Sequence, residues 1–161
     1  MPHLHEKIDF TVDVYLVYKG KVLLRIHDKY RQWFPPGGHI ESHEDPNQAA
    51  IREVKEEVGM NIQLYDSLLT KPVINDAGSR ELIPPYFIDM HPINDTHKHI
   101  SLVYFAQAPT CKINQMVERE KSEGIKWFSE TEIKSADYIL PRIKKYALRA
   151  LKELHMSERQ S

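Results

Sequence analysis

Residues 38–60 read GHIESHEDPNQAAIREVKEEVGM, and this stretch decides the interpretation of the whole chain. We expect a helix over residues 47–58, because Gly59 then follows it and glycine is the preferred residue just past a helix C-terminus. One stripe of this helix is apolar and is expected to pack on a sheet. Its members are Ala50, Ile51, Val54 and Val58.

Three glutamates gather on another stripe of the expected helix. At about 100° per residue, Glu53, Glu56 and Glu57 share an arc of roughly 100°. Like charges one turn apart destabilise a helix. A hard divalent cation would neutralise them, and carboxylate oxygen is the ligand type that Mg²⁺ prefers. The three residues alone leave a plain solvated acidic face as an equal alternative.

The composition of the chain limits what it can do. It has 161 residues, of which 41% are hydrophobic, and a formal net charge of -1. This length suits a single domain over residues 1–161 with its own core. The balanced charge argues against binding nucleic acid by bulk electrostatics, and the apolar content excludes a disordered acidic protein.

The sequence also indicates where the protein works. Its longest apolar runs, about five residues, are far shorter than the roughly 20 that a membrane-spanning helix needs. No apolar stretch after a basic region marks a secretory signal. Cys111 is the single cysteine and cannot form an internal disulfide, which favours a reducing compartment. We therefore expect a cytoplasmic protein without membrane contact.

β-Branched and aromatic residues predict strands on both sides of the decisive segment. Residues 8–18 and 22–26 are expected to form a hairpin around a turn at residues 19–21. Further strands are expected at residues 62–70, 100–106 and 125–128. Residues 27–47 are expected to be a loop, and residues 71–99, rich in proline, allow no assignment.

Two helices are expected after the last strand. Residues 129–132, SETE, have the pattern of a capping box that opens a short helix. Pro141 suits the first turn of a final helix that ends near Met156. Strands first, a helix in the middle and helices at the end predict an α/β sandwich around a mixed sheet.

The decisive segment resembles the signature of the Nudix (MutT-type) hydrolase family, which is Gly, five residues, Glu, seven residues, then Arg-Glu-aliphatic-any-Glu-Glu-any-Gly-aliphatic. Every fixed position is matched, by Gly38, Glu44, Arg52, Glu53, Val54, Glu56, Glu57, Gly59 and Met60. Residues 33–38 and 125–129 resemble the family's usual flanks. The resemblance implies the Nudix fold, an α/β/α sandwich with a central mixed β-sheet and a loop-helix-loop catalytic motif.

The resemblance also implies a reaction. Water attacks one phosphorus of the pyrophosphate in a nucleoside diphosphate that is linked to another moiety. The implied cofactor is Mg²⁺, with Mn²⁺ as an alternative. Glu56 and Glu57 resemble the principal metal ligands, and Glu53 resembles either a ligand or the general base. The resemblance does not assign the general-base role to one of the three glutamates. Gly38 would add a backbone carbonyl as a metal ligand, and Gly37 allows the tight turn before it.

Further site residues follow from the same resemblance. Glu44 and Arg52 look like an ion pair that braces the loop against the helix, with direct phosphate contact by Arg52 as the alternative. Arg25 stands where relatives often carry a phosphate-binding base, and a surface strand charge is the equal alternative. Trp33 would stack on a base or sugar, or fill the core beneath the loop. Glu120 is the favoured extra metal ligand before the last strand, ahead of Glu123 and Glu118, although each is individually more typical of a solvated loop.

Three histidines have no role in the signature. His97 and His99 are two residues apart, so on a strand their side chains share one face. With His91 they could line the substrate pocket or hold zinc, but a plain polar edge is the favoured interpretation.

The substrate is inferred only by elimination, because no subfamily motif is visible outside the signature. A nucleoside triphosphate or a modified nucleotide, including an oxidised one, is the leading class, and a nucleotide sugar or ADP-ribose is the alternative. A catalytically silent nucleotide-binding module is less favoured, because all the signature glutamates are present. The final helix carries several bases, for which a solvated face is favoured over an RNA-binding groove, so nucleic acid is not an expected partner. A homodimer is expected from the resemblance.

Overall fold

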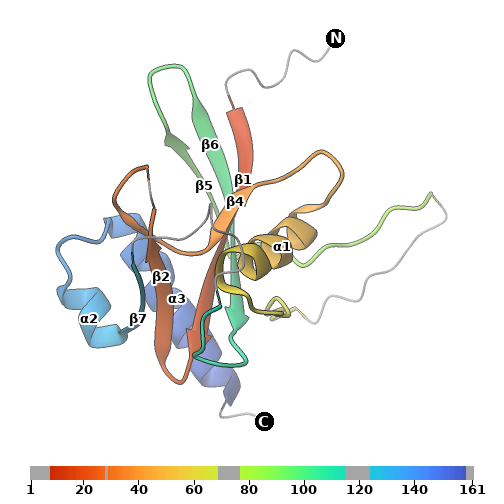
Figure 1. Ribbon diagram of the computed structural model, residues 1–161. Helices are drawn as coiled ribbons and strands as arrows, with labels where there is room; N and C mark the ends of the chain where they lie inside the picture. The colour runs from red at the N-terminus through yellow and green to blue at the C-terminus, as the bar shows by residue number, and fades with distance from the viewer. Residues whose placement is uncertain (1–7, 28, 69–76, 115–123, 159–161) are drawn as a thin grey trace.

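The computed structural model describes residues 8–27, 29–68, 77–114 and 124–158. The first half of the chain contains β1 (Ile8–Tyr18), β2 (Lys21–Ile26), β3 (Trp33–Phe34), β4 (Gly37–His39) and α1 (Pro46–Val58). The second half contains β5 (Phe87–Pro92), β6 (Lys98–Gln107), β7 (Ile125–Ser129), α2 (Glu130–Ser135) and α3 (Pro141–Glu158). Figure 1 shows these elements in one layered body.

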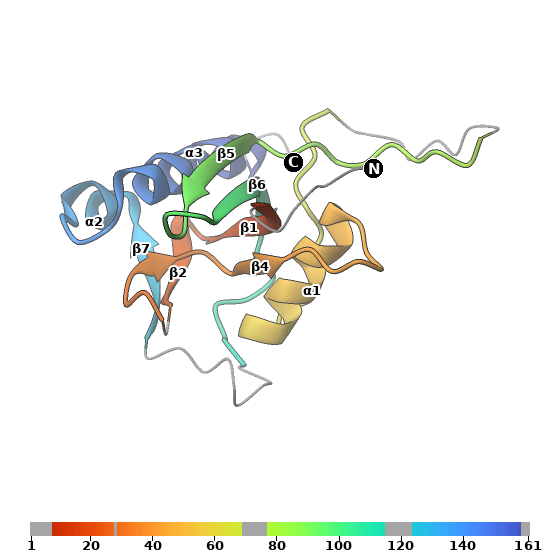
Figure 2. The ribbon, with the colours of Figure 1, turned by 90° about the horizontal axis from the view of Figure 1, so that it is seen from above.

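The described strands form one mixed sheet. Its main path runs β3-β2-β1-β6-β5, while β4 pairs with β1 and β7 pairs with β2. The β1–β6 pair is parallel, and the other pairs are antiparallel. In Figure 2, α1 lies on one side of the sheet and α3 on the other. The predicted α/β sandwich with a mixed sheet is therefore confirmed.

β1 is buried on both faces because it is the centre of the sheet. Val12, Val14 and Leu16 belong to the core beneath α1. Tyr15 and Val17 belong to the core beneath α3. This two-residue alternation is what a strand between two helical layers requires. Two distinct cores thus hold β1 in place. β1 pairs with β4, and the candidate site is built on this pair.

The helix that carries the signature ends as predicted and begins at Pro46, one residue before the predicted start. Asp45 caps it by accepting a hydrogen bond from the backbone N–H of Gln48, and Gly59 ends it with a φ of 72°. One detail of the prediction is wrong, because Ile51 is 38% exposed while Ala49 is fully buried. Glu53 and Glu57 lie among the buried residues of α1, so the inner face of the helix is partly acidic.

Several strand predictions need correction. Residues 62–70 do not form a strand where the structure describes them, since Leu64 makes only an isolated bridge to Ala106. The reason is that β1 and β5 occupy both edges of β6 over most of its length. The loop expected at residues 27–47 contains β3 and β4, and the unassigned residues 71–99 contain β5. The predicted hairpin is present as β1 and β2. The strands predicted at residues 100–106 and 125–128 are present as β6 and β7, and both predicted C-terminal helices are present as α2 and α3.

Candidate active site

The two glycines of β4 bring the sheet and α1 into direct contact. The backbone N–H of Gly37 donates to Oε2 of Glu57 at 2.9 Å. A Cβ added at Gly38 would lie 2.4 Å from Oε1 of Glu53, and one at Gly37 would lie 2.1 Å from the carbonyl oxygen of Val12. A side chain at Gly37 would therefore clash with backbone, and one at Gly38 would displace the Glu53 carboxylate. The glycines place β4 against β1 on one side and against the glutamates on the other.

Arg25 on β2 reaches across to the same group of glutamates. Its Nη2 lies 2.8 Å from Oε1 of Glu57, and each side chain is only 7% exposed. The interpretation of Arg25 as a surface strand charge is wrong, because its partner lies inside the fold. Its Nε has no hydrogen-bond partner among the described residues. Phosphate binding by Arg25 stays a prediction.

Arg52 joins the other carboxylates of the signature. It grips Glu44 with two hydrogen bonds, from Nε at 2.9 Å and from Nη2 at 2.7 Å. Its Nη1 donates to Glu53 and to Glu56, both at 2.9 Å. The predicted Glu44–Arg52 ion pair is present. The hydrogen bonds from Arg52 hold the pKa of Glu44 below its usual value of 4.5.

The carboxylates fit a hard divalent cation. Glu53 and Glu56 converge on one point, since both accept from the same nitrogen of Arg52. The Glu56 side chain is 39% exposed and can be reached by an ion from solvent, whereas Glu53 and Glu57 are nearly buried. Carboxylate and carbonyl oxygens are the ligands that Mg²⁺ takes. Gly38, Glu53, Glu56 and Glu57 are thus close enough to act together, and Glu120 lies outside the described residues.

A cavity of about 480 Å³ adjoins these residues. Its wall includes Arg25, Gly37 and Gly38, which links it to the glutamates. The rest of the wall includes residues of β1, β3, β6 and the start of α3. They include Thr11, Asp13, Phe34, Ser101 and Arg142. A volume in the range of about 300–1,000 Å³ is typical of small-molecule sites.

The polar floor of this cavity was not predicted. Burial raises the pKa of Asp13 to about 6, against the opposing charge of Arg142. Thr11 and Ser101 share a hydrogen bond of 2.7 Å beside it. The signal was available in part, because Asp9, Thr11 and Asp13 alternate with apolar residues along β1 and so share one face.

Arg142 closes the cavity from the side of α3. Its guanidinium carbon lies 5.5 Å from the ring centre of Phe34, and its Nη1 lies 3.7 Å from Asp89. Burial alone would raise the pKa of Asp89, but hydrogen bonds with His91 and Tyr146 and the charge of Arg142 lower it. Arg142 was expected on a solvated helix face, and that interpretation is wrong for this one base.

Trp33 and Phe34 have different surroundings. Trp33 packs edge-on against Phe128, with ring centres 5.0 Å apart, and does not line the cavity. Phe34 does line it, beside its strand partner Arg25. Neighbouring residues on a strand point to opposite faces. The position of Trp33 favours its core-filling alternative over stacking on a substrate.

The histidines gather at one end of the cavity. His91 and His99 line it, and the two are direct partners across β5 and β6. Nε2 of His97 lies 3.1 Å from Oδ2 of Asp9. The favoured interpretation of a plain polar edge is therefore wrong for His91 and His99, which line the pocket instead.

Comparison with known proteins agrees with this fold. The profile of the NUDIX domain matches residues 8–151. A Nudix-family hydrolase from Clostridium perfringens is 35% identical, with a TM-score of 0.79 over 91% of this chain and 97% of the other. A MutT protein from Methanosarcina mazei Go1 is 18% identical, with a TM-score of 0.68 over 94% and 98% of the two chains.

The chain belongs to the Nudix family and is a Nudix hydrolase. This family hydrolyses pyrophosphate bonds in nucleoside diphosphate derivatives and generally uses divalent metal ions. Among the described residues, no helix combines the length and the apolar character needed to cross a bilayer.

Proposed function

We propose that this chain is a Mg²⁺-dependent pyrophosphohydrolase that acts on a nucleoside triphosphate or a modified nucleotide, including an oxidised one. One observation carries the proposal. Glu53 and Glu56 converge on a single nitrogen of Arg52, and Gly38, which lies against Glu53, lines the cavity. The phosphate oxygens of a bound nucleotide would then contact a cation held by the carboxylates. The rest of the nucleotide would lie in the cavity, on its polar floor.

Each residue then has a distinct part in the reaction. Glu56, Glu57 and the carbonyl of Gly38 would hold the cation, and Glu53 would either assist them or accept the proton of the attacking water. The bound cation would neutralise phosphate charge and lower the pKa of that water. Arg52 orients Glu53 and Glu56 through Nη1. Arg25, anchored on Glu57, lines the cavity wall and would contact the phosphate oxygens there.

The cavity wall favours a nucleobase. Phe34 offers an aromatic ring next to the guanidinium of Arg142, and stacking on such groups suits any base. Asp13 adds an acidic group that can accept or donate a hydrogen bond near neutral pH, since burial raises its pKa to about 6. A nucleotide sugar or ADP-ribose is the second candidate, because Thr11, Asp13 and Ser101 also suit sugar hydroxyls. A silent nucleotide-binding module is the least favoured alternative.

The test is a screen of nucleoside triphosphates, oxidised nucleotides, nucleotide sugars and dinucleotides with Mg²⁺ or Mn²⁺, with released phosphate and pyrophosphate as the readouts. Glu56→Gln and Glu57→Gln should each reduce turnover by at least about 100-fold, as loss of a catalytic charge contact does. Glu153→Gln, on the far part of α3, is the matched control and should turn over normally. Turnover that persists in both signature variants would overturn the proposed metal site. Binding without turnover in the parent chain would favour the silent module.

The domain organisation, oligomeric state and cellular location are further proposals. We propose one domain over residues 1–161, a homodimer and a cytoplasmic location. Sedimentation equilibrium measures the oligomeric state directly, and a monomer at all concentrations would contradict the homodimer.

A further inference from the structure

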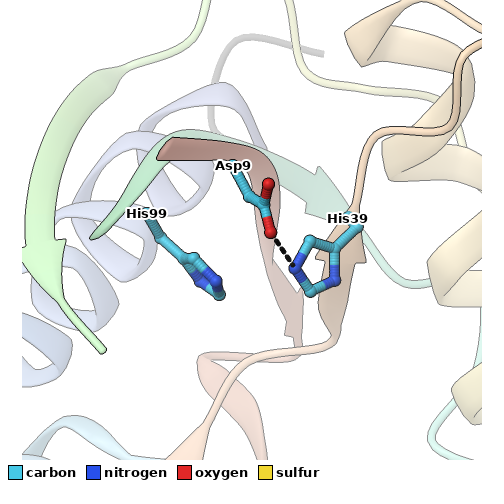
Figure 3. Close-up of side chains that lie close together, drawn as sticks. All are labelled: Asp9, His39 and His99. Atoms are coloured by element: carbon cyan, nitrogen blue, oxygen red, sulfur yellow. Dashed lines mark ion pairs between the residues drawn. The ribbon is translucent and has the colours of Figure 1, made fainter. Parts of the chain in front are cut away.

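Three strands bring imidazoles and a carboxylate together at one end of the sheet. Asp9 on β1 is the direct partner of His99 on β6. His39, on β4, is opposite Thr11, which lies two residues after Asp9 on the same strand face. Figure 3 shows Asp9 between the two rings, with the dashed line marking its contact with His39. The cluster is therefore fixed by strand register.

The spacing of the donor atoms suits one small metal ion. Asp9, His39 and His99 each offer a ligand atom, and these three atoms lie within 4.8 Å of one another. Nε2 of His39 is 3.3 Å from Oδ2 of Asp9. Ligands about 2.0–2.1 Å from a tetrahedral Zn²⁺ are roughly 3.3 Å apart, so this pair already has the required separation. Rotation of the His99 ring would bring the third donor in.

A fourth donor lies beside the three. Nε2 of His97 is 3.1 Å from the same Oδ2 of Asp9, and the His97 and His99 rings are 5.2 Å apart. Four ligands of this kind complete a tetrahedral site, whereas three leave a position open. The Asp9 side chain is 41% exposed and that of His39 is 56% exposed, so an ion can enter from solvent.

The chemistry of the donors also favours a metal ion. Imidazole nitrogen and carboxylate oxygen are both ligands that Zn²⁺ takes. The donors of this cluster therefore have the right chemical character, as well as the right spacing, for one cation.

We propose that Asp9, His39 and His99, with His97 beside them, form a second metal site that binds Zn²⁺ or a similar borderline transition-metal ion. Its donor set differs from that of the signature, because imidazole nitrogen suits Zn²⁺ whereas the all-oxygen signature suits Mg²⁺. His39 and His99 also line the cavity, so this second site lies at the cavity's edge. The site does not depend on the proposed pyrophosphohydrolase activity.

The test is isothermal titration of the tag-free, metal-stripped full chain with Zn²⁺ in excess Mg²⁺, which saturates the signature site. We expect one Zn²⁺ per chain. His39→Gln and His99→Gln should each weaken binding by at least about tenfold, the lower limit for loss of even an outer partner of a metal ligand. Co²⁺ should give visible absorption bands of a nitrogen-liganded site in the parent chain and lose them in both variants.

Three controls keep the result specific. His155→Gln, on the exposed face of α3, and a His3→Gln/His5→Gln double variant should bind Zn²⁺ as the parent does. Glu56→Gln should lose turnover yet retain Zn²⁺, so failure of one proposal is separable from failure of the other. Asp9→Asn, at an exposed side chain, decides the matter if the histidine variants do not fold. Unchanged affinity in the cluster variants, or loss of binding in the His3/His5 variant, would overturn the proposal.

Discussion

Arg25 and Glu57 form a nearly buried ion pair that ties β2 to α1, with 2.8 Å between Nη2 and Oε1. The pair links the cavity wall to a glutamate of the signature. Both side chains are 7% exposed, so little water screens the two charges. Removing one partner leaves the other as a buried charge, and this cost exceeds the value of the pair itself.

Arg25→Met should therefore lower the free energy of unfolding by about 3–5 kcal/mol, the usual cost of breaking a buried pair from one side. Urea denaturation monitored by circular dichroism measures it. An Arg25→Met/Glu57→Leu double variant should recover most of the stability while remaining inactive. Arg149→Met, which breaks an exposed pair with Glu153, should cost less than about 1 kcal/mol. Equal losses in Arg25→Met and Arg149→Met would contradict the buried pair.

Gly37 and Gly38 should respond differently to alanine. At Gly38 the new methyl group meets the carboxylate of Glu53, the end of a flexible side chain. We expect Gly38→Ala to fold but to lose turnover by at least about tenfold, because Glu53 is displaced. At Gly37 the methyl group meets the backbone of Val12, so Gly37→Ala should lower the thermal midpoint instead. Thermal melts and turnover measured on both variants separate the two effects.

The Glu44–Arg52 pair predicts an acid-sensitive component of stability. Hydrogen bonding to Arg52 holds the pKa of Glu44 below 4.5 in the folded chain. The pair is fully stabilising above the unfolded-state pKa and is lost as the pH falls through the folded-state pKa. Glu44→Gln should cost about 1.5 kcal/mol at pH 7, and the difference from the parent should shrink below about pH 4.

Urea titrations at a series of pH values test this prediction, with Glu81→Gln at an exposed position as the matched control. A Glu44→Gln deficit that stays constant down to acid unfolding would show that the carboxylate charge is not what stabilises the loop.

Phe34 and Trp33 allow a second comparison at adjacent positions. Phe34→Leu should raise KM several-fold with little change in stability, because its ring lines the cavity next to Arg142. Trp33→Leu should instead lower the free energy of unfolding by about 2 kcal/mol through lost packing on Phe128. Steady-state kinetics and urea denaturation of both variants are the measurements. The reverse pattern would return Trp33 to a substrate-stacking role.

Local patterns predicted what local contacts determine. Gly59 could be placed at the end of α1 because it contacts a backbone group within a turn of itself. The Glu44–Arg52 pair was implied by the family resemblance, and its two members are only eight residues apart. The strand expected at residues 62–70 failed for the opposite reason. Its apolar pattern suits a strand, but β5 occupies that edge of β6 as far as Val103, which leaves only the last residues of β6, where Leu64 bridges Ala106.

The cavity required contacts between distant parts of the chain. Asp13 could be placed on a strand face from the alternation in β1, but nothing in that pattern says that Arg142 approaches it. Tyr146 and Asp89, joined by a 2.9 Å hydrogen bond, are 57 residues apart. The burial of Glu53 and Glu57 could not be predicted either. A helical wheel separates the faces of a helix, but it does not say which face β4 and its glycines will cover.

The parallel pairing of β1 with β6 has a consequence for synthesis. Thr11 and Ser101, which share a hydrogen bond across this pair, are 90 residues apart. At the usual 5–20 residues per second, β1 must wait several seconds on the ribosome for its central partner. The β1–β2 hairpin can form early, but the cavity and the histidine cluster can assemble only after residue 101 has emerged. Nascent chains shorter than this should therefore be the species that depends on chaperones.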